Sequence, residues 1–232
     1  MSGTFITLPS HDGQQFDAYL ALPPKGTGPG IVLIQEIWGV NAHIQAVADQ
    51  YALDGYVVMA PDVFWRQQPR VNLQYDEEGT KMAYHYMQNL DGGNAVADLK
   101  TTAHALRARP ELTGKIASVG YCMGGRLSFH LAATGTIDAA VCYYGGGIHN
   151  HLDTAHSIKV PILFHYAELD KHIPQTAVES VEKAFEDHAD AEIHLYPGVD
   201  HGFNCWGRPM YNQRAAALAR GRTLEWLATR LG

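Results

Sequence analysis

One segment decides the fold of this chain, Ile116-Ala117-Ser118-Val119-Gly120-Tyr121-Cys122-Met123-Gly124-Gly125. It joins an apolar, β-branched run, typical of a buried strand, to residues 126–133, which are typical of a helix. Cys122 lies at the junction, with Gly120 and Gly124 two residues to either side. This is the Gly-x-nucleophile-x-Gly pattern of a nucleophile elbow, a strand-to-helix turn so tight that flanking side chains would collide.

The turn indicates why a cysteine here would be reactive. A side chain at a helix N-terminus faces unpaired N–H groups and the positive end of the helix dipole, and both favour a thiolate. The N–H of Met123 is also placed to stabilise a tetrahedral oxyanion. A glycine-rich turn can instead bind a dinucleotide, but the Gly-x-Gly-x-x-Gly spacing is absent and no Walker lysine follows. We therefore predict that Cys122 is a nucleophile.

Strand and helix patterns alternate on both sides of this segment. Buried strands are predicted at residues 31–35, 56–60, 116–121, 139–144, 160–166 and 191–196, and a less regular antiparallel pair is expected around Phe5 and at 16–22. Helices are predicted at 177–187, with Val178, Val181 and Phe185 on one face, and at 211–231, with Ala215, Leu218, Leu224 and Leu227 on one face.

This alternation predicts an α/β fold with a mainly parallel central sheet, right-handed crossovers, and helices on both faces. The chain has no internal repeat, low-complexity run or long linker, which favours a single domain over residues 1–232. Such sheets bind ligands beyond the carboxyl ends of their strands. Catalytic residues are therefore expected directly after strands.

Two residues at such positions complete a catalytic triad. Asp170 follows the strand at 160–166, and His201 follows the strand at 191–196, so that nucleophile, acid and base come in the expected order. His201 would exchange the thiol proton, and Asp170 would fix the tautomer and orientation of its ring. Glu168 is the alternative for the acid. His165 and His194 lie inside predicted strands and are interpreted as structural.

Composition and charge exclude several function classes. A net charge of −7 gives no general attraction to nucleic acid or to an anionic membrane. No secretory signal opens the sequence, and its apolar runs are too short to span a bilayer. Three cysteines, an odd number, are expected to be free thiols in a reducing compartment, so we predict a cytoplasmic protein. Nothing in the sequence demands an oligomer, and we expect a monomer.

With these residues placed, the chain resembles the dienelactone hydrolase (carboxymethylenebutenolidase) family over essentially its whole length. The resemblance is carried by Gln35-Glu36-Ile37-Trp38-Gly39-Val40-Asn41, Ala60-Pro61-Asp62, Gly120-Tyr121-Cys122-Met123-Gly124-Gly125, Tyr143-Tyr144-Gly145, Asp170 and His201-Gly202-Phe203. It implies an α/β-hydrolase fold and hydrolysis of a small ester or lactone, with no cofactor.

The resemblance also implies further site residues. In the family, the carboxylate matched by Glu36 lies near the resting thiol and helps to convert it to thiolate as substrate arrives. The N–H of Ile37 is expected to be the second oxyanion donor, and Tyr84 and Tyr144 are expected to line the substrate pocket. A structural ion pair is the alternative role for Glu36.

The sequence departs from the family where substrate would be recognised. Members that act on dienelactone grip its carboxylate with two arginines, and those positions are Thr80 and Cys205 here. The serine that normally follows the catalytic histidine is Gly202. Lys81 and Arg208 lie nearby in sequence and could replace these arginines, but a role as solvated surface charges is equally open. Trp206 and Cys205 suggest a more apolar pocket, which leaves neutral esters, thioesters and other lactones as alternative substrates. Phe203 and Trp206 are expected to contact the substrate.

Three other interpretations are less favoured. The histidines at 149 and 151 suggest a metal, but no third ligand is evident, so we assign no metal to this loop. A catalytically idle fold used for ligand binding or sensing is a second alternative, opposed by the intact triad. A redox-sensing role for Cys122 is the third, and it would require Cys142 or Cys205 to lie close by.

Overall fold

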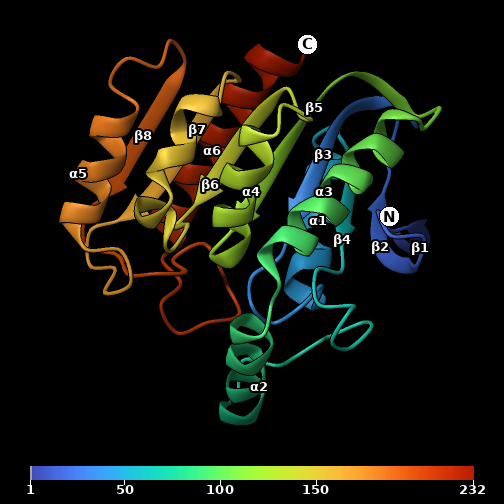
Figure 1. Cartoon of the computed structure of the whole chain (residues 1–232), viewed down its shortest axis with the longest axis horizontal. Coiled ribbons are helices and arrows are strands. Elements are labelled where there is room, and N and C mark those ends of the chain that lie inside the picture. Colours follow the sequence, from blue (N-terminus) through green and yellow to red (C-terminus); the bar gives the residue numbers. More distant parts are fainter. Residues whose placement is uncertain (1) are drawn as a thin grey trace.

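The computed structural model describes residues 2–232, which form an eight-stranded sheet with helices on both faces (Figure 1). The strands are β1 Thr4–Pro9, β2 Gln15–Ala21, β3 Gly28–Ile34, β4 Val57–Pro61, β5 Leu112–Tyr121, β6 Ala139–Tyr143, β7 Ile162–Ala167 and β8 Ala191–Tyr196. The α-helices are α1 Ala42–Leu53, α2 Glu77–Gln88, α3 Gly92–Arg107, α4 Met123–Ala133, α5 Gln175–Ala184 and α6 Gln213–Leu231, with 3-10 turns at Ile148–Asn150 and Leu152–Ser157.

The sheet is mainly parallel, as predicted. Its order is β1-β2-β4-β3-β5-β6-β7-β8. All strand pairs from β4 through β8 are parallel, whereas β1 pairs with β2 and β2 with β4 in antiparallel fashion. The predicted antiparallel pair at the N-terminus is therefore confirmed at one edge. Each predicted strand overlaps an observed one.

The strand order places the functional loops together. The chain passes from β3 outward to β4 and then returns past β3 to β5, so the direction of travel reverses between β3 and β5. Loops leaving the carboxyl ends of strands on either side of such a reversal diverge and leave a crevice. Glu36 follows β3 and Cys122 follows β5, so both residues lie at this crevice.

Two layers of helices cover the sheet. Figure 1 shows α3, α4 and α5 in front of the sheet and α6 behind it. Helix α1 shares the rear face with α6, because Arg220 of α6 forms an ion pair with Asp54 at the end of α1. Helix α2 projects at the lower edge of the molecule, away from both layers (Figure 1). Within residues 2–232, no helix is both long enough and apolar enough to cross a membrane.

Both predicted helices are present, but one residue that was predicted to face the core does not. Val178, Val181 and Phe185 are buried as predicted. Leu218, which was expected to be buried on α6, is 48% exposed. The buried face of α6 contains Ala219 and Thr223 instead. Successive residues of an α-helix are rotated by about 100° around its axis, so Leu218 points away from the face that contains Ala219.

A buried polar network attaches α6 to the sheet. The hydroxyl of Thr223 lies 2.9 Å from Nε2 of His165 on β7 and 2.7 Å from the hydroxyl of Tyr143 on β6. The other ring nitrogen of His165 lies 2.9 Å from the hydroxyl of Tyr196. His165 is thus a structural residue in the middle of the core, as its position in the sequence indicated.

Thr223→Val should destabilise the protein by about 2–3 kcal/mol, because it leaves buried groups of Tyr143 and His165 without a partner. Urea unfolding at neutral pH measures the change. Thr229→Val is the matched control on the same helix, since the hydroxyl of Thr229 contacts only groups of its own helix. Equal stability for Thr223→Val and the parent would contradict this role.

Candidate active site

The elbow at Cys122 has the strained geometry that its sequence predicted. Cys122 adopts φ 57° and ψ −118°, between the end of β5 and the start of α4. A Cβ atom on Gly120 would lie 1.9 Å from the carbonyl oxygen of Gly124, and one on Gly124 would lie 2.3 Å from that of Ile34. Glycine is therefore required at both positions. The Cys122 N–H donates to the carbonyl of Tyr143, which ties the turn to β6.

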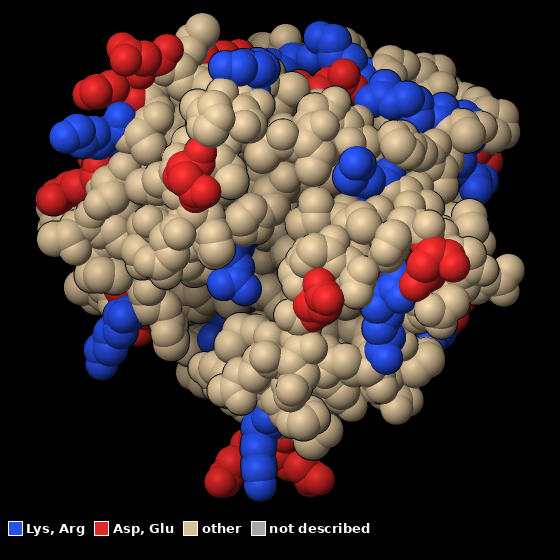
Figure 2. Space-filling view, viewed as in Figure 1, with Lys and Arg blue, Asp and Glu red and all other residues tan. Residues whose placement is uncertain are grey.

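The Cys122 side chain opens into a cleft of about 220 Å³. The lining residues are Ile37, Trp38, Tyr84, Met87, Cys122, Met123, Arg126, Gly146, Gly147, His172, His201 and Arg208. Figure 2 shows this face hollowed above α2, with basic side chains inside the hollow. The lining contains two arginines and no carboxylate. The cleft thus gathers two cationic side chains in a chain whose net charge is −7.

His201 and Asp170 form the expected pair. Nδ1 of His201 donates to Oδ2 of Asp170 over 2.7 Å. The other oxygen, Oδ1, accepts the backbone N–H groups of His172 and Ile173, which fixes the carboxylate. Glu168, the alternative acid, is exposed and accepts the N–H of Gly198 instead. Of the two acids, the structure brings only Asp170 to His201.

The surroundings of His201 favour its protonated form. Burial alone would lower its pKa, but the charge of Cys122 and the hydrogen bond to Asp170 outweigh burial and raise the pKa to about 10. His201 is thus an imidazolium at neutral pH in this arrangement. It can hold a proton beside the sulfur and deliver it to a leaving group.

The two expected oxyanion donors, Ile37 and Met123, both line the cleft. Met123 is the first residue of α4, so its N–H has no acceptor within the helix. Ile37 comes from the loop after β3, on the other side of the crevice. Ile37 and Met123 therefore line the same cleft as Cys122, from the ends of neighbouring strands.

Of the two roles that the sequence left open for Arg208, the structure excludes a solvated surface charge. Its side chain is 12% exposed, and Nη1 lies 3.5 Å from Oε1 of Glu36, whose side chain is 1% exposed. The guanidinium carbon lies 4.6 Å from the ring centroid of Trp38. A Cβ atom on Gly202 would lie 2.2 Å from Nη1 of Arg208. The glycine that replaces the usual serine therefore makes the space that this guanidinium fills.

Arg126 supplies a second cation to the cleft. It lies on the first turn of α4, and its Nη1 would be 3.0 Å from a Cβ atom on Gly147, a residue with φ 88°. Within residues 2–232, Arg126 forms no ion pair with a carboxylate. Sequence reasoning missed Arg126, although its position one helical turn after Cys122 indicates that it could reach the cleft. Lys81, the other cation that the sequence left open, is exposed on α2.

The predicted substrate residues separate into two groups. Tyr84 lines the cleft from α2. Tyr144 and Phe203 are fully buried instead, with the ring of Tyr144 5.1 Å from His201 and 5.5 Å from Phe203. Tyr144 therefore packs against His201 in the core, and Phe203 packs against Tyr144. Trp206 lies outside the cleft and lines a separate cavity of about 410 Å³ between α1 and α6. The sequence had suggested that it lines the substrate pocket, and the structure does not place it there.

Comparison with known proteins gives the family. The model of the dienelactone hydrolase family matches residues 16–231. The chain is 36% identical to carboxymethylenebutenolidase from Pseudomonas putida over 96% of this chain and 95% of that protein. It is 32% identical to carboxymethylenebutenolidase 1 from Cupriavidus pinatubonensis, with the same coverage of both chains.

Solved structures agree. A candidate dienelactone hydrolase from Klebsiella pneumoniae subsp. pneumoniae MGH 78578 superposes with a TM-score of 0.85 at 28% identity, covering 97% of this chain and 98% of that chain. A phosphotriesterase from metagenomic libraries, P91, superposes with a TM-score of 0.80 over the whole of both chains, and its 21% identity supports the fold alone. The protein has the α/β-hydrolase fold and belongs to the dienelactone hydrolase family.

Proposed function

We propose that this protein hydrolyses a small lactone or enol ester that carries a carboxylate, with Cys122 as the nucleophile. The observation that carries the proposal is that Cys122 and the Asp170-bound His201 line one cleft, together with two arginines and no carboxylate. Arginine binds carboxylates through paired, charge-assisted hydrogen bonds. The relatives named carboxymethylenebutenolidase support a lactone as substrate.

In the first step, the Cys122 thiolate attacks the carbonyl carbon and a carbon–sulfur bond forms. The carbonyl electron pair moves to oxygen, where the N–H groups of Ile37 and Met123 stabilise it. When the tetrahedral intermediate collapses, the carbon–oxygen bond of the ring or ester breaks. The leaving oxygen takes the proton from His201, which becomes a neutral imidazole.

In the second step, neutral His201 removes a proton from water, and the resulting hydroxide attacks the thioester. The carbon–sulfur bond breaks, which releases the acid and restores the Cys122 thiolate beside the imidazolium. Asp170 keeps the His201 ring in one orientation throughout. In the tetrahedral intermediate formed from an amide, the thiolate would leave more readily than the amine. That intermediate would therefore return to the substrate. Esters and enol lactones are therefore the expected substrates.

Glu36 is proposed to take part through Arg208. At rest, the guanidinium of Arg208 is the nearest cation to the buried Glu36 carboxylate, at 3.5 Å. A substrate carboxylate entering the cleft would compete with Glu36 for this guanidinium. Where Cys122 is still protonated, the Glu36 carboxylate freed from this pairing would accept the thiol proton and leave the thiolate that the first step requires. Substrate arrival and thiol activation would thus be coupled.

The free thiols support the proposal that the protein is cytoplasmic. Cys122, Cys142 and Cys205 are all unpaired, which fits a reducing compartment such as the cytoplasm.

Cys122→Ala should lower kcat for a carboxylated enol lactone by at least about a thousandfold, because the covalent step is lost. Cys142→Ala is the matched control, since Cys142 is fully buried in β6 and should keep the parent rate. Steady-state hydrolysis, with circular dichroism to verify folding, measures both. Normal turnover by folded Cys122→Ala would exclude the proposed nucleophile.

Arg126→Gln should raise KM for a carboxylated lactone by roughly tenfold to a hundredfold, the effect of losing one charge-assisted contact. KM for a neutral ester of similar size should change little. Lys81→Gln, an exposed change on the neighbouring α2, is the control and should affect neither substrate. If Arg126→Gln impairs both substrates equally, the cleft does not select for a carboxylate, and a neutral ester becomes the better candidate.

Removal of the Cys122 sulfur should lower the pKa of His201 from its value of about 10, since the charge of Cys122 is the largest influence that raises it. Imidazole resonances of the parent and Cys122→Ala, followed by NMR across a pH titration, give the two pKa values. The His194 ring, in β8, serves as an internal reference because it contacts Glu192 and lies apart from the cleft. The same pKa for His201 in the parent and in Cys122→Ala would show that no thiolate–imidazolium pair forms.

A further inference from the structure

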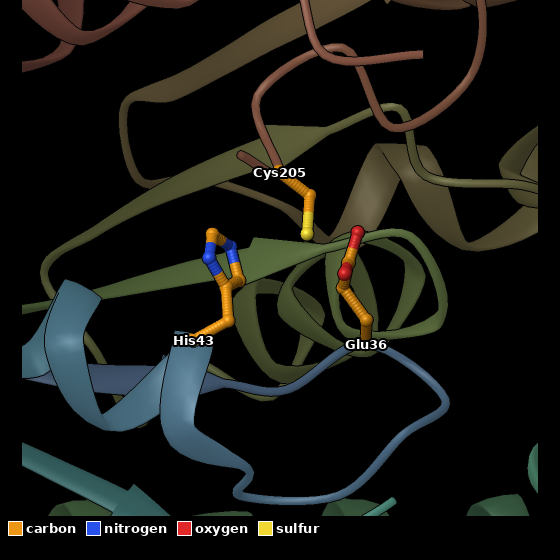
Figure 3. Close-up of side chains that lie close together, drawn as sticks. All are labelled: Glu36, His43 and Cys205. Atoms are coloured by element: carbon orange, nitrogen blue, oxygen red, sulfur yellow. The ribbon is translucent and has the colours of Figure 1, made fainter. Parts of the chain in front are cut away.

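A second cluster of reactive side chains lies next to the cleft, and Figure 3 shows its three members pointing toward one another. Glu36 comes from the loop after β3, His43 from the first turn of α1, and Cys205 from the loop before α6. Their ligand atoms all lie within 4.8 Å of one another. The three residues are 1%, 5% and 0% exposed, respectively.

Several atoms of this cluster lack hydrogen-bond partners. Within residues 2–232, neither carboxylate oxygen of Glu36 has one, and Nδ1 of His43 also has none. Arg208 lies 3.5 Å from Glu36, too far for a good hydrogen bond. A buried carboxylate and a buried imidazole nitrogen without partners are costly, and native proteins rarely leave such groups unmatched. The arrangement therefore points to a ligand that accepts lone pairs from both residues.

The neighbouring residues prepare Cys205 to act as a thiolate ligand. Burial has the larger effect and raises the pKa of Cys205, whereas the hydroxyl of Tyr75 lowers that pKa and so favours the thiolate. Nδ2 of Asn41 donates to the oxygen of that hydroxyl over 3.1 Å, which holds Tyr75 in place. Hydrogen bonds of this kind orient metal ligands and tune them.

We propose that Glu36, His43 and Cys205 form a binding site for a thiophilic divalent cation of the zinc class. Nitrogen, sulfur and carboxylate oxygen are the donors that zinc takes, and a solvent molecule would complete four-fold coordination. Magnesium and calcium are disfavoured, because they prefer sets made of oxygen alone. Small side-chain rotations would bring the three ligand atoms to the separations that bonds of about 2.0–2.3 Å require.

The pKa values of His43 and Cys205 decide which protons these ligands carry before the metal binds. Burial lowers the pKa of His43, which leaves a neutral imidazole with a lone pair for the metal. Burial raises the pKa of Cys205 to about 12, so the free thiol is protonated at neutral pH. The metal–sulfur bond forms as the thiol proton is released to solvent. No oxidant or reductant is involved.

Access to the site passes beside Trp206. Its ring centroid lies 4.1 Å from that of His43, and the side chain is 42% exposed at the wall of the 410 Å³ cavity. Rotation of this one side chain would expose His43. If Glu36 acts as proposed above, an occupied site would hold its carboxylate away from Cys122 and slow hydrolysis. That consequence rests on the proposed function, whereas the metal site does not.

Cadmium is the suitable probe, because cadmium–thiolate bonds absorb in the ultraviolet. Cys122 can itself bind thiophilic metals, so the titration uses the Cys122→Ala protein, freed of metal with a chelator. One equivalent of Cd²⁺ should produce the charge-transfer band, and Zn²⁺ should displace it. The band should disappear in Cys122→Ala/Cys205→Ala and persist in Cys122→Ala/Cys142→Ala.

His43→Gln, introduced into the Cys122→Ala protein, provides a second variant that keeps all remaining thiols. It should weaken Cd²⁺ binding at least tenfold, as loss of a ligand requires. His156→Gln, in the exposed 3-10 turn, should have no effect. If Cys205→Ala fails to fold, as judged by thermal unfolding, the His43→Gln comparison decides alone.

Absence of the band in Cys122→Ala, or a band unaffected by both Cys205→Ala and His43→Gln, would overturn the proposal. A proton or a water molecule would then be what satisfies Glu36. Because Cys122 is absent from every protein in this experiment, either outcome leaves the proposed hydrolysis to be judged by its own tests.

Discussion

The turn at Cys122 constrains the whole active site. A backbone with φ 57° and ψ −118° at a non-glycine residue is costly, and it persists because the structure on both sides holds it. Strand β5 lies in the centre of the sheet, between β3 and β6, and α4 packs on the same strands. The contacts within about 2 Å that bar any side chain from Gly120 and Gly124 show how closely the helix start approaches the strands. This rigidity fixes the sulfur and the Met123 N–H together.

Around this fixed point, the cleft derives its charge from residues far apart in the sequence. Arg126 comes from the helix that follows the nucleophile, and Arg208 reaches back from the loop before α6. Arg208 fits because Gly202 has no side chain. Three departures from the family pattern therefore belong together. Cys205 stands at the position of one family arginine, Gly202 at that of the serine, and Arg208 delivers a guanidinium to the same cleft from three residues after Cys205.

Glu36 lies between two sets of groups. On one side, Arg208 joins it to the cleft, and on the other, His43 and Cys205 converge on it. A buried carboxylate without a hydrogen bond responds strongly to any cation that approaches, because the surrounding dielectric constant is low. Substrate binding at Arg208 and cation binding at His43 and Cys205 would therefore act on the same carboxylate in different ways.

The sequence by itself determined the parallel sheet, the elbow and the positions of Asp170 and His201. These features are local, because apolar runs mark strands, glycines mark the turn, and functional loops follow strand ends. Helix α2 had no such signal, since only Gly79 and Ala83 are buried and the rest of its surface is polar or exposed. The face of α6 was misjudged at Leu218 because alanines and Thr223 form its buried stripe.

Only the tertiary structure decided which charges enter the cleft and which are solvated. Sequence proximity gave Lys81 and Arg208 the same interpretation, yet Lys81 is exposed on α2 and Arg208 is folded back onto Trp38 and Glu36. The grouping of Glu36, His43 and Cys205 was equally hidden, since loops from distant parts of the chain bring these residues together. Such contacts depend on how loops pack across the sheet edge, and no local pattern of residues encodes that packing.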